Sequence, residues 1–190
     1  MRTRLGNLIY HHRNVMFPVI YILLFVKGPF LIPDYRIAAV VGILIAAAGQ
    51  LIRGVTVGLE YIKRVGLNRR PYADDLVQGG IFAHCRNPLY LGNFTILLGA
   101  GIASNSLVFM AAGIPFFLVA YTCIIAAEEA YLRGKFGADF DDYCARVPRI
   151  LPRLAGIGRT MSSMSFNWKR LISAEYNSAF IWLIACFSSV

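Results

Sequence analysis

Long apolar stretches alternate with shorter polar ones along most of this 190-residue chain. A helix needs about 17–25 residues to cross a hydrocarbon core of about 30 Å. Four stretches reach that length and predict membrane-spanning helices: residues 15–32, 37–59, 88–104 and 107–127. A fifth, 179–190, is apolar but short, so it can span, lie in the bilayer surface or make a dimer contact. The pattern predicts an all-α integral membrane helical bundle with four to five transmembrane helices.

The third and fourth apolar stretches are separated only by Asn105 and Ser106. So short a connection predicts a tight hairpin whose two outer ends return to the same membrane face. The polar segments 79–92 and 128–152 stand at those ends, so we expect them to form one pocket at a membrane surface. We therefore assign residues 1–156 to a membrane domain with a motif core at 79–152. Residues 157–190 are assigned to a C-terminal interfacial segment that ends in a short apolar helix.

Composition supports a membrane protein, because 57% of the residues are hydrophobic and only 15% are charged. The net charge of +9 is concentrated, with 16 of the 19 basic residues on one side of the expected topology. This is the positive-inside pattern, so the N-terminus and both motif segments are expected in the cytoplasm, on the inner membrane if the source is prokaryotic. Such a surface binds anionic lipid headgroups, and we expect no nucleic-acid partner.

The four cysteines show no pairing pattern, and neither a Cys-x-x-Cys nor a His-x-x-x-His spacing occurs. We therefore expect free thiols and no metal site.

Several polar residues within or beside the apolar stretches are candidates for chemistry. Arg53 lies six residues before the end of the second stretch, and an intramembrane arginine is a functional candidate by default. It can also reach the headgroups or pair with Glu60. Asn87 and Pro88 form a strong helix start, with Asn as N-cap. Gly42, Ala46 and Gly49 share one helix face, and Thr95, Gly99 and Ala103 recur at four-residue spacing, which close helix contact explains.

Glu128 and Glu129 follow the fourth apolar stretch directly. Adjacent carboxylates at a membrane boundary repel each other and lose hydration, so they require cationic partners. Arg146 and Arg149 are the nearest fixed cations that can bind a carboxylate or phosphate. A solvated helix end is the alternative interpretation.

The two motif segments resemble the isoprenylcysteine carboxyl methyltransferase and phospholipid methyltransferase superfamily of membrane enzymes. The resemblance covers about 73 residues in order and in spacing, and it is carried by Gly80, Phe82, Arg86, Asn87, Pro88, Tyr90, Gly92, Glu128, Glu129, Leu132, Phe136, Gly137, Phe140, Tyr143, Arg146, Val147, Pro148 and Pro152. Asn87 departs from the histidine of the isoprenylcysteine enzymes and cannot act as a titrating base. His84 lies nearby but outside the pattern.

The resemblance implies S-adenosylmethionine as methyl donor and a lipid or lipidated acceptor, either a phospholipid headgroup amine or a prenylcysteine-type carboxylate. Glu128 or Glu129 would hold the donor's ammonium, and Arg86 or an amide at the helix start its carboxylate. The implied cofactor-binding residues are Arg86, Asn87, Pro88, Tyr90, Gly92, Gly99, Glu128 and Glu129. The implied catalytic residues are Arg146 and Glu129, and the acceptor side is assigned to Arg146, Tyr143 and Arg53.

Two other functions remain open on the sequence. A reductase of the sterol-reductase type, which binds NADPH, shares the motif region but has a longer region before it. A non-catalytic helical scaffold is the third possibility. The sequence decides neither the acceptor nor the oligomeric state.

Overall fold

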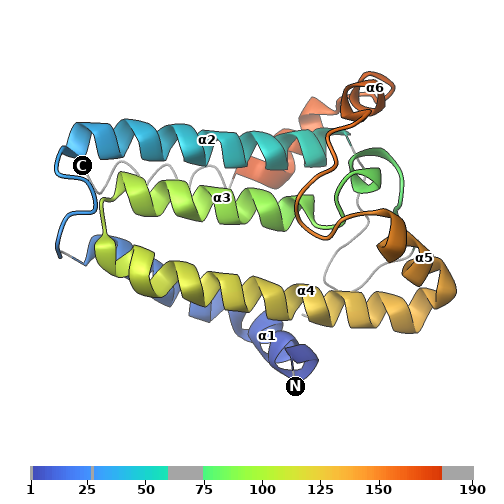
Figure 1. The fold of residues 1–190 in the computed structure, drawn as a ribbon, viewed down its shortest axis with the longest axis horizontal. Helices are drawn as coiled ribbons and strands as arrows, with labels where there is room; N and C mark the ends of the chain where they lie inside the picture. The colour runs from blue at the N-terminus through green and yellow to red at the C-terminus, as the bar shows by residue number, and fades with distance from the viewer. Residues whose placement is uncertain (1, 27, 60–74, 177–190) are drawn as a thin grey trace.

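The computed structural model describes residues 2–26, 28–59 and 75–176, and the regular elements in these ranges are helical (Figure 1). The α-helices are α1 (Arg2–Tyr21), α2 (Tyr35–Leu59), α3 (Pro88–Ala103), α4 (Ile114–Phe136), α5 (Ala138–Arg146) and α6 (Ile157–Ser162). Short 3-10 turns occupy Ile22–Phe25 and Gly80–Ala83, and a π-helical turn occupies Phe109–Gly113. Residues 168–176 are also helical. The predicted all-α membrane bundle is confirmed.

Three helices of the described ranges are long and apolar enough to cross a membrane: Arg2–Phe25, Tyr35–Leu59 and Phe109–Phe136. The helix expected at residues 88–104 is present as α3, but its 16 residues make it shorter than these spans. At 1.5 Å per residue it is about 24 Å long. The fifth apolar stretch, 179–190, lies outside the described residues.

The boundaries expected for the first helix were wrong. We expected this helix at residues 15–32, but α1 begins at Arg2 and ends at Tyr21. The early start follows from packing against α4. A Cβ at Gly6 would overlap the carbonyl of Cys123, so the two helices touch at that point. Ile9 and Tyr10 are buried in the same contact, and this burial stabilises a helix with a polar outer face.

A seam of small residues joins α2 to α3. The stripe expected at Gly42, Ala46 and Gly49 faces α3: a Cβ at Gly42 would overlap the backbone of Ala103, and one at Gly49 would crowd the carbonyl of Gly92. Lipid gives no hydrophobic drive between membrane helices, so close backbone approach supplies the dispersion contacts that hold the pair together. The stripe is confirmed as a packing surface.

Aromatic side chains join α1 to α4. Phe17 of α1 lies edge-on to Phe117 of α4 with ring centroids 5.0 Å apart, and Tyr21 stacks on the same ring at 5.4 Å. Phe117 is completely buried. The two arms of the hairpin thus pack mainly on different partners, α3 on α2 and α4 on α1, and touch each other little (Figure 1).

The short hairpin connection is confirmed, and polar contacts tie it to the neighbouring connection. Asn105 has a left-handed backbone with φ 51°. Its side-chain Oδ1 accepts a hydrogen bond from the Ile32 amide at 2.8 Å, and its Nδ2 donates to the Ile32 carbonyl at 2.7 Å. The Ser106 hydroxyl donates to the Leu23 carbonyl at 2.9 Å. These bonds hold the helix pairs together at the end of the bundle opposite the motifs.

The C-terminal segment does not stand apart from the membrane domain. The backbone N–H of Asn167 donates to the Gly58 carbonyl at 2.8 Å, and the ring of Phe166 lies against Gly58. The helical residues 168–176 then lie beside α2 in Figure 1. The residues expected to lie at the membrane interface therefore pack in part against the bundle.

We predict that Gly99→Ala lowers thermal stability, because its Cβ would overlap the backbone of Gly42 and Ala46 and force α2 and α3 apart. Overpacking of this kind typically costs about 1–3 kcal/mol. The measurement is the unfolding midpoint of the purified protein in detergent. Gly134→Ala is the matched control, because a Cβ at this position in the last turn of α4 meets nothing within 4 Å. An unchanged midpoint for Gly99→Ala would show that the seam has room to spare.

Candidate functional site

The two motif segments lie side by side, as expected from the hairpin. The backbone N–H of Arg86 donates to the Pro148 carbonyl at 3.0 Å, and that of Arg153 donates to the His84 carbonyl at 2.9 Å. The His84 side chain is buried and bonds the Arg153 carbonyl and the Thr160 hydroxyl, so it has a structural place. These bonds fix residues 84–86 against 148–153, and we call this end of the bundle the motif end.

Asn87 and Pro88 begin α3, as expected. Pro88 is the first helical residue and Asn87 is the N-cap residue, but the Asn87 side chain makes no capping bond to its own helix. Its Nδ2 donates instead to the Arg149 carbonyl at 3.0 Å. The side chain therefore joins the two motif segments.

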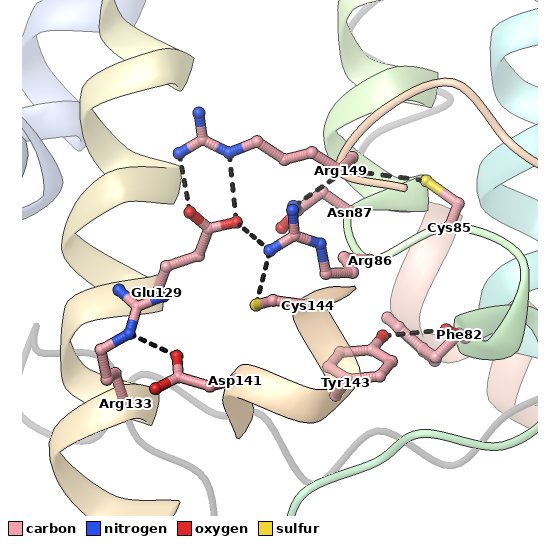
Figure 2. Close-up of polar contacts among 10 residues, drawn as sticks. All are labelled: Phe82, Cys85, Arg86, Asn87, Glu129, Arg133, Asp141, Tyr143, Cys144 and Arg149. Atoms are coloured by element: carbon pink, nitrogen blue, oxygen red, sulfur yellow. Dashed lines mark hydrogen bonds and ion pairs between the residues drawn. The ribbon is translucent and has the colours of Figure 1, made fainter. Parts of the chain in front are cut away.

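Glu129 is the centre of the charged cluster at the motif end (Figure 2). Its carboxylate accepts from Arg86 Nη1 at 2.9 Å, and Arg149 binds both of its oxygens, Nε at 3.1 Å and Nη2 at 2.9 Å. The side chains of Arg86 and Glu129 are 15% and 18% exposed, so solvent screens their attraction only partly. Two guanidinium groups on one carboxylate leave an excess positive charge at this point. The sequence predicted that this carboxylate pair needs cations, and Glu129 has two.

Only some of the N–H donors of the Arg86 guanidinium have hydrogen-bond partners among the described residues. Its Nη1 also donates to the Cys144 sulfur at 2.7 Å, whereas its buried Nε has no hydrogen-bond partner among the described residues. Burial raises the pKa of the Cys144 thiol, and the nearby Arg86 charge lowers it by less. Burial likewise raises the pKa of Cys85. Both thiols are therefore protonated at neutral pH and poor nucleophiles.

Glu128 faces the gap between the hairpin arms, about 100° around α4 from Glu129. The Tyr90 hydroxyl of α3 donates to its Oε1 at 2.7 Å. This bond crosses from one hairpin arm to the other close to the motif end. The adjacent carboxylates thus have different partners, which separates their charges.

Comparison with known proteins gives the family. The sequence model of the phospholipid methyltransferase family matches residues 37–139, more than half of the chain. The chain belongs to the phospholipid methyltransferase family. The match covers all but the first two residues of α2, all of α3 and α4, and thus Glu128–Glu129, whereas α1, Cys144 and Arg149 lie outside it.

Two relatives are metal-resistance proteins by name. The nickel-cobalt-cadmium resistance protein NccN of Alcaligenes xylosoxydans xylosoxydans is 36% identical over 81 residues, which are 43% of this chain and 38% of the relative. The cobalt-zinc-cadmium resistance protein CzcN of Cupriavidus metallidurans is 35% identical over 80 residues, 42% of this chain and 37% of the relative. The chain therefore matches less than two fifths of either relative. No solved structure matches the chain.

Two residues assigned to the acceptor side lie outside the charged cluster of this family member. Tyr143 is 1% exposed, and its hydroxyl donates to the Phe82 carbonyl at 2.8 Å, so it packs α5 against the first motif segment. Arg146 is exposed and donates to Gln78 Oε1 at 2.8 Å. It does not reach Glu129, because its position on α5 directs it to the surface. Of the two arginines named as the nearest cations, Arg149 is the one that binds Glu129.

The two glycines assigned to cofactor binding face α2 rather than the cluster. A Cβ at Gly92 would press against the side chain of Arg53, and one at Gly99 would overlap the backbone of Ala46. Both lie on the α2 side of α3, whereas Tyr90 faces α4. Close helix contact, the alternative stated for Gly99, accounts for both glycines.

Arg53 is bound within the bundle of this family member instead of reaching towards headgroups. Its Nε and Nη2 bind the two oxygens of Glu175 at 2.8 and 2.7 Å, and its Nη1 donates to Asn93 Oδ1. Gln50 also donates to Glu175 at 3.0 Å. Glu175 is 4% exposed, so this is a buried ion pair between α2 and the C-terminal segment. The expected alternative partner, Glu60, lies outside the described residues.

The sequence did not point to Cys144, Asn93 or Glu175. Each is a single polar residue outside the family pattern we used. Glu175 carried one usable signal, because an intramembrane arginine requires a carboxylate and few are available. Its distance of 122 residues from Arg53 concealed the pairing.

We predict that Glu175→Gln strongly destabilises the bundle, because it leaves the Arg53 charge buried without its partner. Removing one member of a buried pair typically costs about 3–5 kcal/mol. The unfolding midpoint in detergent measures the effect. The double variant Arg53→Met with Glu175→Leu is the control, and it should recover much of the loss since neither charge remains. Equal stability of the single variant and the parent would show that the pair contributes nothing.

Proposed function

We propose that this protein is a membrane methyltransferase that transfers a methyl group from S-adenosylmethionine to a membrane lipid at the cytoplasmic face. The observation that carries the proposal is the cluster of Arg86, Glu129 and Arg149 beside the Glu128–Tyr90 bond, at the open end of an apolar hairpin. Family membership supports the reaction and the lipid class. We favour a phospholipid headgroup amine as the methyl acceptor over a prenylcysteine-type carboxylate.

The residues present fit the charged groups of the donor. S-adenosylmethionine has a carboxylate and an ammonium on its amino-acid end. Arg86 has a buried Nε with no partner among the described residues, and Arg149 adds a second guanidinium, so the cluster can accept a carboxylate. Glu128, one residue from Glu129, offers a carboxylate to the ammonium. The Arg86–Glu129 pair keeps both charges neutralised before the donor binds.

The bound donor supplies an electrophilic methyl group on a sulfonium. The chain's own contribution is orientation and exclusion of water, since methyl transfer by in-line displacement requires no covalent enzyme intermediate. Glu129 holds the two arginines in position, and Tyr90 orients the Glu128 carboxylate at 2.7 Å. The Asn87 side chain is committed to the Arg149 carbonyl, so its part is to hold the second motif segment in place.

The proposal places the N-terminus and the motif end in the cytoplasm. Asp34 immediately precedes α2 and Arg159 lies in α6, and the N-terminal end of α2 and α6 lie at opposite ends of the bundle in Figure 1. In a cysteine-free background with single cysteines at these positions, an impermeant maleimide added to intact cells should label position 34 and spare position 159. Position 159 should react after lysis. Labelling of position 159 alone in intact cells would reverse the orientation.

Donor binding is the direct test of the function. Titration calorimetry of the purified protein should show binding of S-adenosylhomocysteine and no binding of NADPH, which a reductase would bind. Glu128→Gln should weaken this binding by about 1.5–3 kcal/mol, the range of a charge-assisted hydrogen bond. Arg149→Gln should also weaken it, because the cluster then has no excess positive charge to hold the donor carboxylate. Methyl-labelled S-adenosylmethionine with phosphatidylethanolamine liposomes should yield labelled lipid.

Two matched controls accompany these variants. Arg146→Gln removes the same charge as Arg149→Gln from an exposed side chain, and Asp142→Asn removes an exposed carboxylate of α5. Both should bind S-adenosylhomocysteine like the parent. If Glu128→Gln and Arg149→Gln also bind like the parent, the cluster is structural only.

A further inference from the structure

A cavity of about 420 Å³, widely open on one side, lies between α1, α3 and α4, farther from the motif end than the charged cluster. It exists because α3 packs on α2 and α4 packs on α1, so the two hairpin arms diverge. Its polar lining comes from Arg13 and Asn14 of α1, Asn93 of α3, and Tyr21 and Tyr121. Among the residues that the structure describes, this lining includes one cation and no carboxylate.

Arg13 is half-buried in this lining and lies within a helix long enough to span the membrane. Its guanidinium lies 4.2 Å from the centre of the Tyr10 ring. No carboxylate lies within ion-pair distance of it among the described residues, in contrast to Arg53, Arg86 and Arg149. An arginine at membrane depth without a counter-charge is costly, so a bound anion would stabilise it.

The Asn93 side chain is held in place by Arg53 of α2. Its Oδ1 accepts from Arg53, which is itself fixed by both oxygens of Glu175. Because the amide oxygen is occupied, its NH2 group is the part left to donate. Asn93 and the Arg13 guanidinium therefore present hydrogen-bond donors on the same cavity, to which the Tyr21 and Tyr121 hydroxyls can add.

Two tyrosines in ring contact, Tyr121 and Tyr90, connect the cavity to Glu128 beside the charged cluster. The ring of Tyr121 lies 5.4 Å from that of Tyr90, whose hydroxyl binds Glu128. Glu128 and Tyr121 are seven residues apart on α4, about 10 Å along the helix. The Arg13 side chain points towards Tyr10, hence towards the motif end, because α1 runs antiparallel to α4. Beyond Tyr121 the surroundings are aromatic, with Phe17 and Phe117.

From the motif end inwards, the bundle therefore presents the Glu128 carboxylate, then the Arg13 guanidinium, then the apolar rings of Phe17 and Phe117. A phospholipid presents an amine, a phosphate and acyl chains in the same order from the membrane surface inwards. We propose that this cavity is the acceptor subsite and that Arg13, with Asn93, binds the phosphate of a phospholipid whose headgroup reaches towards Glu128. This inference rests on the proposed function and specifies its acceptor as a phosphate-bearing lipid. Arg13 lies outside the family match at residues 37–139, so the match does not assign it a role.

The test is equilibrium binding of a tail-labelled phosphatidylethanolamine to the purified protein in detergent micelles, followed by fluorescence anisotropy. Unlabelled phosphatidic acid, which keeps the phosphate, should compete, and diacylglycerol, which lacks it, should compete at least about tenfold more weakly. Arg13→Gln should bind the probe at least about tenfold more weakly than the parent, the loss expected for one charge-assisted hydrogen bond. Arg13→Lys should retain part of the preference for phosphatidic acid, and its unfolding midpoint reports on folding.

Arg4→Gln is the matched control, because it removes the same charge from the same helix nine residues earlier and leaves this cavity unchanged. It should bind the probe like the parent. The subsite is refuted if Arg13→Gln also does so while folded, or if the parent does not distinguish phosphatidic acid from diacylglycerol. Competition by inorganic phosphate as strong as that by phosphatidic acid would instead indicate a site for free phosphate and overturn the lipid assignment.

Titration of the same samples with S-adenosylhomocysteine separates this inference from the proposed function. A parent that binds the lipid through Arg13 but does not bind S-adenosylhomocysteine supports the subsite and refutes the methyltransferase. A parent that binds S-adenosylhomocysteine without an Arg13-dependent lipid preference refutes the subsite alone.

Discussion

The backbone contact between α2 and α3 is the constraint on which the rest of this bundle depends. Glycines at positions 42, 49, 92 and 99 bring the two helices so close that no side chain separates them along much of the seam. The face of α3 that carries the small residues packs against α2. The aromatic face of α4 is therefore buried against α1 instead. The hairpin arms therefore separate away from the turn at Asn105. The cavity beside Arg13 and the Tyr90–Glu128 bond both lie in the space that results.

The arginine side chains of the bundle and the motif end are balanced in three different ways. Arg53 is neutralised by a buried carboxylate, Glu175, and serves as a fixed support for Asn93. Arg86 and Arg149 share one carboxylate, Glu129, which leaves capacity for another anion. Arg13 lies over the Tyr10 ring and has no carboxylate within ion-pair distance among the described residues. The Arg86–Arg149–Glu129 cluster and Arg13 therefore each carry one uncompensated positive charge among the described residues, which the proposed donor carboxylate and lipid phosphate would neutralise.

The motif end shows how polar contacts join segments that the membrane helices only bring near each other. The side chains of Asn87 and His84 bond the backbone carbonyls of Arg149 and Arg153. The backbone N–H of Arg86 donates to a third carbonyl, that of Pro148. Tyr143 bonds the Phe82 carbonyl from within a buried cluster. Such bonds are strong where water is scarce, so they position Arg149 over Glu129 without a regular helix at that point.

Much of the fold follows from the sequence by itself, because a segment that crosses the bilayer must be apolar, helical and long enough to span it. Apolar length specifies the helices α2, α3 and α4, the two-residue connection specifies the hairpin, and spacing specifies the stripe of Gly42, Ala46 and Gly49. The resemblance identified Glu128, Glu129 and Arg86 as a group. The start of α1, the choice between Arg146 and Arg149 as the second cation on Glu129, and the partner of Arg53 were decided only by tertiary structure. In each case the deciding contact is made across the bundle, by residues far apart in the sequence. Spacing along the chain does not show how one helix is rotated against another, nor that the C-terminal segment folds back along α2.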